Sequence, residues 1–338
     1  MQRRGITVIL GAILVTLLAW GISAAPVPYV LLGPGPTVDT LGADRGHDVI
    51  EVTGADETDS AGQLRLVTVS VRSDLDLLDA IRGWFDDSTA VVPRELIYPP
   101  DKTVEEVEQE NAQQFEASQT SAETAALREL GYPVQVTVTS IVQGSPAEAA
   151  LKVNDVITSV DGQQVTSGQK LAELIRSKPV GTALAIGYTR DGKAATATIA
   201  SAAADDGSPR IGVAVEQKQP HPFTLKIDLD EIGGPSAGLM FALGIIDKLK
   251  PEDLTGGIII AGTGTIDDEG RVGPIGGVPQ KLVAAKAANA KVFLTPADNC
   301  AEAVANAVPG LNLVKIGTLD EALAALETLR AGGEPPHC

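Results

Sequence analysis

A serine at the start of an apolar stretch is the first residue that could do chemistry in this 338-residue chain. Ser236 lies in the segment GGPSAGLMFALGIID, where glycines relax steric limits and Pro235 suits the first position of a helix. Apolar residues then recur at helical spacing, which predicts a helix beginning near Ser236. Backbone N–H groups without partners collect at such a helix end, so the position favours an alkoxide or an oxyanion.

Lys281 is the candidate base for this serine. It lies downstream in RVGPIGGVPQKLVAAKAANAKVFL, where two glycines make a turn and Pro279 can open a second helix. Burial among apolar neighbours and the positive helix end both disfavour an ammonium, so we expect a lowered pKa. A neutral amine can take the proton of a serine hydroxyl. The structural alternative is that the serine segment only caps a core helix and that the lysine is solvated.

Charge and cysteine content limit the partners. The chain has 26 Lys and Arg residues against 44 Asp and Glu residues, for a formal net charge of −18. Since a phosphate backbone requires a basic face, we expect no nucleic-acid partner. Cys300 and Cys338 lack nearby metal ligands apart from His337, and we expect neither a metal nor a cofactor. A Cys300–Cys338 bridge in an oxidising compartment is one hypothesis, and two free thiols are the other.

Residues 6–25 form an apolar run without charges that is long enough to cross a bilayer. Arg3 and Arg4 precede it, which predicts a single-pass helix in the cytoplasmic membrane with residues 1–5 inside and the rest of the chain outside. A cleaved signal peptide is the alternative, because Ser23 and Ala25 could form a cleavage site. Pro26 disfavours that cleavage, so we favour a retained anchor in contact with lipid.

Strand-like and helical stretches alternate through most of the remaining sequence. Residues 62–71 alternate like a strand, and 103–130 read as a charged helix stopped by Gly131 and Pro133. Strands and helices also alternate from Ile211 onward, which predicts a mixed α/β layer rather than a bundle or a barrel.

Residues 132–200 look like a separate, mostly β module. Four strand-like runs surround one amphipathic helix near 168–177, and Asp-Gly pairs supply tight turns. The segment GSPAEAALKVNDVITSVDGQQV, followed by a helix and KPVGT, resembles a bacterial PDZ domain. PDZ domains bind an extended peptide by adding a strand beside that helix. The resemblance implies a peptide groove walled by Val136, Val138, Ile141, Leu171, Leu174 and Ile175.

The segments around Ser236 and Lys281 resemble the proteolytic domain of Lon-type serine peptidases. The matching elements are GGPSAGLMFALGIID and AGTGTIDDEGRVGPIGGVPQKLVAAKAANAKVFL. Position by position, the resemblance implies that Ser236 is the nucleophile, Lys281 the base and Thr263 the residue that orients the lysine. Backbone N–H groups of Ser236 and Ala237 would hold the oxyanion.

The whole arrangement is similar to the membrane-anchored, PDZ-containing Lon-like proteases of bacteria. The expected fold class is α/β (α+β), a Lon-type proteolytic domain with an inserted PDZ domain and an N-terminal transmembrane helix. The expected divisions are a cytoplasmic end (1–5), the anchor (6–25), a juxtamembrane arm (26–45), a first protease part (46–131), the PDZ domain (132–200), a linker (201–209), the catalytic part (210–330) and a loose tail (331–338).

The same resemblance implies a serine endopeptidase acting on unfolded, membrane or secreted proteins, assembled as a homo-oligomeric ring, commonly of six. No GxxxxGK[ST] loop occurs in the sequence, so the activity is expected to be independent of ATP. Many relatives carry an acidic residue where this chain has Gly233, and Asp230 and Glu231 are the acidic residues nearby.

Two other functions compete with this prediction. Residues 234–238 also satisfy G-x-S-x-G, the signature of an α/β-hydrolase esterase, but His337 is the only histidine after Ser236. The second alternative is a non-catalytic PDZ adaptor or holdase at the membrane, in which the Lon-like domain serves only for assembly.

Overall fold

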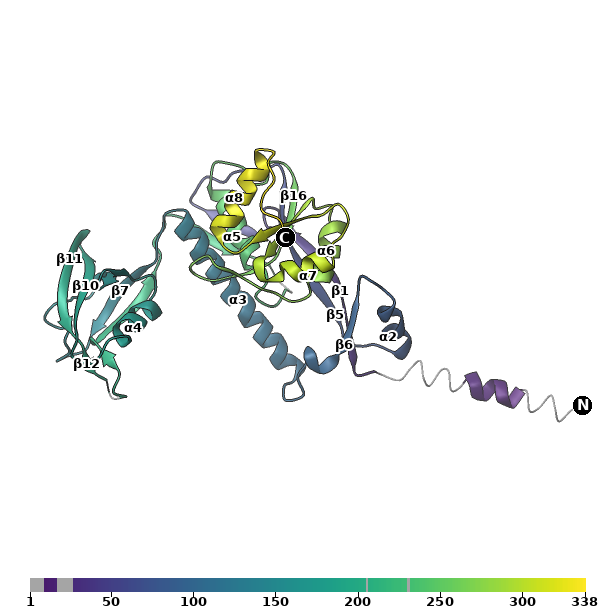
Figure 1. Cartoon of the computed structure of the whole chain (residues 1–338), viewed down its shortest axis with the longest axis horizontal. Helices are drawn as coiled ribbons and strands as arrows, with labels where there is room; N and C mark the ends of the chain where they lie inside the picture. The colour runs from purple at the N-terminus through teal and green to yellow at the C-terminus, as the bar shows by residue number, and fades with distance from the viewer. Residues whose placement is uncertain (1–8, 17–26, 205, 230–231) are drawn as a thin grey trace, which may run out of the picture. The chain divides into compact units, whose positions relative to one another are not determined.

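The computed structural model describes residues 9–16, 27–204, 206–229 and 232–338 (Figure 1). It forms two compact units, one built from the chain up to Ala126 and again from Phe223, the other from Leu127 to Pro222. The second unit therefore interrupts the first in sequence.

A six-stranded mixed sheet forms the centre of the first unit, in the order β20-β19-β16-β5-β1-β6. The first four strands of this order run parallel, while β1 pairs antiparallel with both of its neighbours. Their bounds are β1 (Tyr29–Asp39), β5 (Gln63–Arg72), β6 (Ala90–Pro93), β16 (Ile259–Gly262), β19 (Val292–Pro296) and β20 (Asn312–Ile316).

The predicted juxtamembrane arm, 26–45, is largely a strand of this sheet. The sequence does not predict β1 as a strand because Pro34 lies in it. The register of β1 against β5 also shifts between Pro34 and Thr37. At Gly35 the strand approaches β5 so closely that a Cβ would lie 2.2 Å from the Thr68 hydroxyl.

Helices cover this sheet. Every residue of α5 (Gly238–Leu249) from Gly238 to Lys248 is buried, as expected of a helix that is apolar on all sides. The remaining helices of the unit are α2 (Leu77–Trp84), α3 (Val104–Glu129, which continues into the second unit), α6 (Val278–Ala287), α7 (Cys300–Ala305) and α8 (Leu319–Arg330), with short 3-10 turns η1 (Arg94–Leu96) and η2 (Ala297–Asn299). Its short strand pairs are β2 (Ala43–Asp44) with β3 (His47–Asp48), β4 (Ile50–Thr53) with β15 (Thr224–Ile227), and β17 (Thr265–Ile266) with β18 (Val272–Gly273).

The second unit is a sheet in the order β11-β10-β8-β7-β14 with one helix, α4 (Gly168–Arg176). Its strands are β7 (Gln135–Ile141), β8 (Val156–Val160), β9 (Gln163–Gln164), β10 (Ala183–Arg190), β11 (Lys193–Ala200), β12 (Ala202–Ala203), β13 (Pro209–Arg210) and β14 (Val213–Lys218). The predicted module ended at residue 200, but β14 belongs to this sheet because it pairs with β7 from Val213 to Lys218. The segment 201–209 is correspondingly not a linker, since β12 and β13 form a hairpin within the unit.

The last residues, 331–338, were predicted to be loose, and this prediction is wrong. A disulfide joins Cys300 to Cys338, with the two Cα atoms 5.1 Å apart. The backbone N–H of Lys315 donates to Pro336 and that of Cys338 donates to Leu313, so the tail lies along β20. Because an extended Gly- and Pro-containing tail has no periodicity, its pairing could not be read from the sequence.

Most of the predicted transmembrane segment, namely residues 6–8 and 17–25, lies outside the described residues. Residues 9–16 are helical. Among the residues that the structure describes, no helix combines the length and the apolar character needed to span a bilayer.

Candidate active site

Lys281 lies in the first turn of α6, and its side chain is only 3% exposed. Gly277 precedes the helix with φ +70°, and a Cβ there would lie 2.5 Å from Val69 on β5. A glycine is therefore required where α6 docks on the sheet. Burial lowers the pKa of Lys281 from 10.5 to about 8, because an ammonium loses its hydration in this position.

Thr263 connects the lysine to the serine segment. It follows β16 directly, and its hydroxyl accepts a hydrogen bond from Lys281 Nζ at 3.0 Å. The same hydroxyl donates to the backbone carbonyl of Ser236 at 3.0 Å. Since a hydroxyl has one proton to donate, these two bonds fix its orientation and hold the amine beside the serine segment.

Ser236 lies in a tight loop immediately before α5. The loop is held by α3, where the Asn111 carbonyl accepts from Gly234 N–H at 2.9 Å and the Ser118 hydroxyl donates to the Pro235 carbonyl at 3.0 Å. Gly264 N–H donates to the Ser236 carbonyl at 2.9 Å. The backbone of the serine is therefore fixed from two sides.

Small residues are necessary around this loop. A Cβ at Gly238 would lie 2.8 Å from Ile266 and 2.9 Å from the Ser118 hydroxyl, so the start of α5 packs closely against both elements. Gly234 has φ +85°, which favours glycine.

Ser236 and Lys281 line the same cleft, which has a volume of about 710 Å³. Its walls come from β5 and from the loops before α5 and α6. Ser236 also borders a second hollow of about 370 Å³, formed with Thr265, Pro274 and Ile275. The serine therefore borders both hollows.

Two backbone donors are left at the serine. Within the described part of the chain, the N–H groups of Ser236 and Ala237 donate to no acceptor. They lie at the start of α5, where the helix dipole adds positive potential. The arrangement can receive a developing oxyanion, and the oxyanion role of these two residues stays a prediction.

The remaining predictions for this site have different outcomes. Asp230 and Glu231 lie outside the described residues. His337 pairs with Val314 on β20, at the far end of the sheet order from the strands that line the cleft, which removes the basis of an esterase triad. The sequence analysis did not predict that Asn111 and Ser118 support the serine loop, because the sequence of a charged helix does not show which residues its polar groups bond.

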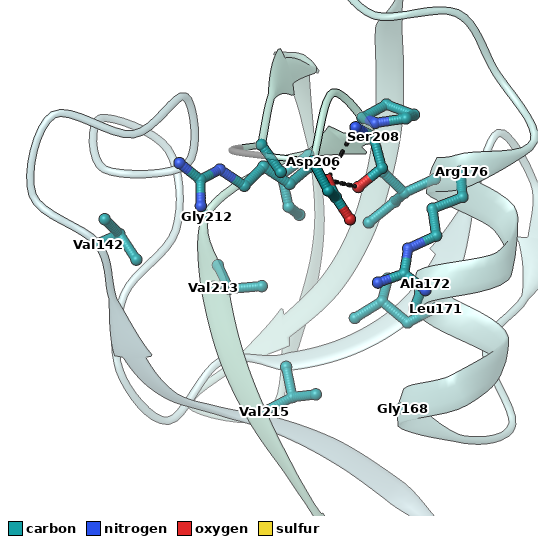
Figure 2. Close-up of a pocket in the computed structure, with 15 residues that line it drawn as sticks. Val142, Gly168, Leu171, Ala172, Arg176, Asp206, Ser208, Gly212, Val213 and Val215 are labelled. Atoms are coloured by element: carbon teal, nitrogen blue, oxygen red, sulfur yellow. Dashed lines mark hydrogen bonds between the residues drawn. The ribbon is translucent and has the colours of Figure 1, made fainter.

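The second unit has a groove of about 510 Å³ between α4 and β14 (Figure 2). Of the three predicted helix residues, Leu171 and Ile175 line this groove and Leu174 does not. The predicted wall, Val136, Val138 and Ile141 on β7, is wrong. β7 pairs with β8 on one side and β14 on the other, so it offers no free edge, and Val136 and Val138 are fully buried. Val213 and Val215 of β14 take their place.

Two protein families match parts of this chain. Residues 231–327 match the Lon protease (S16) C-terminal proteolytic domain, and residues 105–200 match the PDZ domain. Lon protease 2 of Bacillus subtilis is 38% identical over 94 residues, which are 27% of this chain and 16% of that protein. Lon protease 1 of Sorangium cellulosum is 37% identical over 112 residues, or 31% of this chain and 14% of that protein. The match thus spans less than a fifth of either relative.

Solved structures of PDZ domains are similar to part of this chain. The PDZ domain of an SdrC-like protein from Listeria innocua is 34% identical, with 26% of this chain and 99% of that chain covered at a TM-score of 0.24. Its counterpart from Listeria monocytogenes is 33% identical, with 24% and 85% covered at a TM-score of 0.23. The chain carries a serine-peptidase domain of the Lon type and a PDZ domain.

Proposed function

From the premise that residues 231–327 form a Lon-type proteolytic domain, we propose that this chain is an ATP-independent, membrane-anchored serine endopeptidase. Ser236 is its nucleophile, Lys281 its general base and Thr263 the residue that orients the lysine. The observation that carries the proposal is the buried amine of Lys281, with its lowered pKa and its hydrogen bond to Thr263, in the cleft that Ser236 lines.

The contacts of Lys281 suit a base. A neutral amine has two N–H donors and one lone pair, and Thr263 Oγ1 accepts a hydrogen bond from one of those donors. The lone pair is left for the serine hydroxyl. As the Ser236 oxygen attacks the scissile carbonyl carbon, Lys281 takes the hydroxyl proton, and the N–H groups of Ser236 and Ala237 stabilise the oxyanion.

The second half of the reaction reverses these roles. The Lys281 ammonium gives its proton to the departing amine as the peptide bond breaks, which leaves an ester on Ser236. A water then attacks that ester while Lys281 takes one of the water protons, and Lys281 returns this proton to the Ser236 oxygen as the ester bond breaks, which releases the acid and restores the hydroxyl. The serine proton leaves on the amine and a water proton replaces it, so the cycle needs no other reactant than water.

The shape of the site favours an extended substrate. Because Ser236 borders two hollows, residues of an extended segment near the scissile bond can contact the walls of either hollow. Folded chains cannot present such a segment, so we propose that the substrates are unfolded or locally unfolded membrane or secreted proteins. The sequence has no GxxxxGK[ST] loop with which to couple ATP hydrolysis to unfolding.

We place the anchor at residues 6–25, with residues 1–5 in the cytoplasm and the peptidase domain outside. The apolar run and the two preceding arginines support this. We also propose a homo-oligomeric ring, commonly of six copies in relatives of this type. Sedimentation of the detergent-solubilised chain as a monomer at micromolar concentration would exclude the ring.

The PDZ domain is proposed to bind peptides between α4 and β14. β14 ends the order of its sheet, so its outer edge can accept an added strand. Fluorescein-labelled peptides with apolar carboxyl-terminal residues provide a probe. Ala172→Trp, which fills the groove, should weaken binding about tenfold or more, whereas Glu173→Trp on the exposed face should not. Equal binding by both variants excludes the groove.

Casein cleavage by the full chain in detergent tests the peptidase proposal. Ser236→Ala and Lys281→Met should each lower the rate by about three orders of magnitude or more. Lys286→Met is the matched control, because this lysine lies on the same helix and donates to the Gly310 carbonyl rather than to a group of the site. Cleavage by the first two variants at the rate of the control would make the chain a non-catalytic binding protein.

A further inference from the structure

Helix α2 exposes an apolar face in the first unit, near the start of β1 (Figure 1). The exposed residues follow one side of the helix and continue into the residue after it. They are Leu78 at 46%, Ile81 at 38%, Trp84 at 59% and Phe85 at 86% exposure. Four large apolar side chains together on a short surface helix indicate a surface that is covered in use.

The opposite side of α2 fixes this face outward. Ala80 and Gly83 are buried against the sheet, and a Cβ at Gly83 would lie 2.3 Å from Leu31 on β1 and 2.9 Å from Val91 on β6. The helix cannot turn its apolar side inward without breaking this close contact.

The exposed face lies next to the end of the apolar run 6–25. Only Pro26 separates Ala25 from Val27, and two residues reach at most about 7 Å. Val27 N–H already donates to the Leu75 carbonyl at 3.3 Å, just before α2, and the Tyr29 ring packs edge-on against Trp84 at 6.0 Å. A chain that leaves a bilayer at residue 25 must therefore hold α2 at the lipid surface.

We propose that the apolar face of α2, defined as Leu78, Ile81, Trp84 and Phe85, inserts into the interfacial region of the membrane lipid. Trp is enriched at membrane–water interfaces, and Trp, Phe and Leu form the apolar face of helices that lie in the interface. This inference rests on the proposed anchor. It adds a second contact, which fixes the peptidase domain at a defined height above the bilayer.

The charges near α2 select among lipids. The sequence from residue 72 to residue 87, which includes α2, is acidic, with Asp74, Asp76, Asp79, Asp86 and Asp87 against Arg72 and Arg82. Anionic head groups would be repelled by this excess of carboxylates, so α2 binds neutral lipid and depends on the anchor to keep it close.

The two tryptophans of the chain make a direct test, since Trp20 lies in the apolar run and Trp84 on α2. The full chain is reconstituted into phosphatidylcholine vesicles whose acyl chains carry bromine either near the head group or near the methyl end. Trp20→Phe leaves Trp84 as the only tryptophan, which is excited selectively near 295 nm, where tyrosine absorbs little. Its fluorescence should be blue-shifted in vesicles and quenched several-fold more by the shallow bromines than by the deep ones.

Trp84→Phe, which leaves only Trp20, separates the failure of this inference from failure of the anchor. Trp20 quenched by bromine with Trp84 unquenched overturns the docking of α2 and leaves the anchor in place. Neither tryptophan quenched overturns both. Trp84 shielded from bromine and also from aqueous iodide means that protein, such as a second copy of the chain, covers the face, and this too overturns the proposal.

Discussion

Lys281 Nζ lies 3.0 Å from Thr263 Oγ1, in a position where the lysine is 3% exposed and its pKa is lowered to about 8. The same threonine donates to the carbonyl of Ser236. One hydroxyl thus joins the proposed base to the backbone of the proposed nucleophile.

The pH dependence of peptidase activity should report this amine. Because the neutral form of Lys281 is the base, kcat/KM should rise with pH and reach half of its maximum near pH 8, the pKa of the buried amine. Initial rates of casein cleavage between pH 6 and about pH 9.5 provide the measurement. A flat profile over this range would show that another group accepts the proton.

Thr263→Val should impair catalysis without removing either reacting group. The isosteric side chain can neither accept from Lys281 nor donate to Ser236, so kcat should fall about 10- to 100-fold, equivalent to about 1.4–2.7 kcal/mol. Thr263→Ser retains the hydroxyl and should recover most of the rate. Equal losses in both variants would indicate that the methyl group, not the hydroxyl, matters.

Lys281→Met should stabilise the folded protein while abolishing activity. With the pKa lowered from 10.5 to about 8, the folded state disfavours the ammonium by about 3 kcal/mol at neutral pH. The sign follows from proton counts, since between these two pKa values the unfolded chain binds the proton more tightly and wild-type stability rises with pH. The gain of the variant should therefore be greatest below pH 8 and disappear above about 10.5.

Denaturant unfolding at pH 7 and at pH 10 measures this difference. Lys286→Met, a substitution of a less buried lysine on the same helix, serves as the control for the loss of a lysine side chain from α6.

Gly277→Ala should lower both stability and activity. The residue has φ +70°, and its added Cβ would lie 2.5 Å from Val69, so the cost should be about 1–3 kcal/mol, with α6 and Lys281 displaced. Gly276→Ala is the matched control, because a Cβ at that glycine has no atom within 4 Å. Thermal unfolding of the two variants compares them, and equal melting temperatures would contradict the close contact.

Removing the disulfide should lower the free energy of unfolding by about 2–4 kcal/mol, as expected for a bridge that closes a loop of this length. Cys300 and Cys338 are 38 residues apart. Unfolding of the double Cys→Ser variant, compared with oxidised and reduced wild type, measures the effect. Reduction should bring wild type to the stability of the variant and leave the variant itself unchanged.

The sequence predicted local structure best where a residue type has a single structural role, such as glycine in a turn or proline at the start of a helix. Apolar neighbours and glycine turns predicted the helices that begin near Ser236 and at Lys281, and the structure places both residues on one cleft. The contact between Thr263 and Lys281 was expected from the family resemblance rather than from local pattern. The catalytic roles of these residues remain predictions.

The sequence could not predict which segments pair when they lie far apart along the chain. β1 was not predicted as a strand because it contains Pro34. β14 was assigned to the wrong unit because the sequence of a short alternating strand does not show which strand it pairs with. The error at β14 displaced the predicted peptide groove by one strand. Asn111 and Ser118, which support the serine loop, were missed for the same reason, since their partners lie far away in sequence.

The tail bonded along β20 has a consequence for the behaviour of the protein in solution. β20 ends the sheet, and an uncovered edge strand is a template on which other chains can pair and aggregate. The backbone bonds to Leu313 and Lys315 occupy that edge, and the bridge to Cys300 keeps the tail in place. Reducing conditions would therefore do more than lower the stability of the fold. Without the disulfide the tail can leave β20, and the exposed edge of this strand can then pair with other chains.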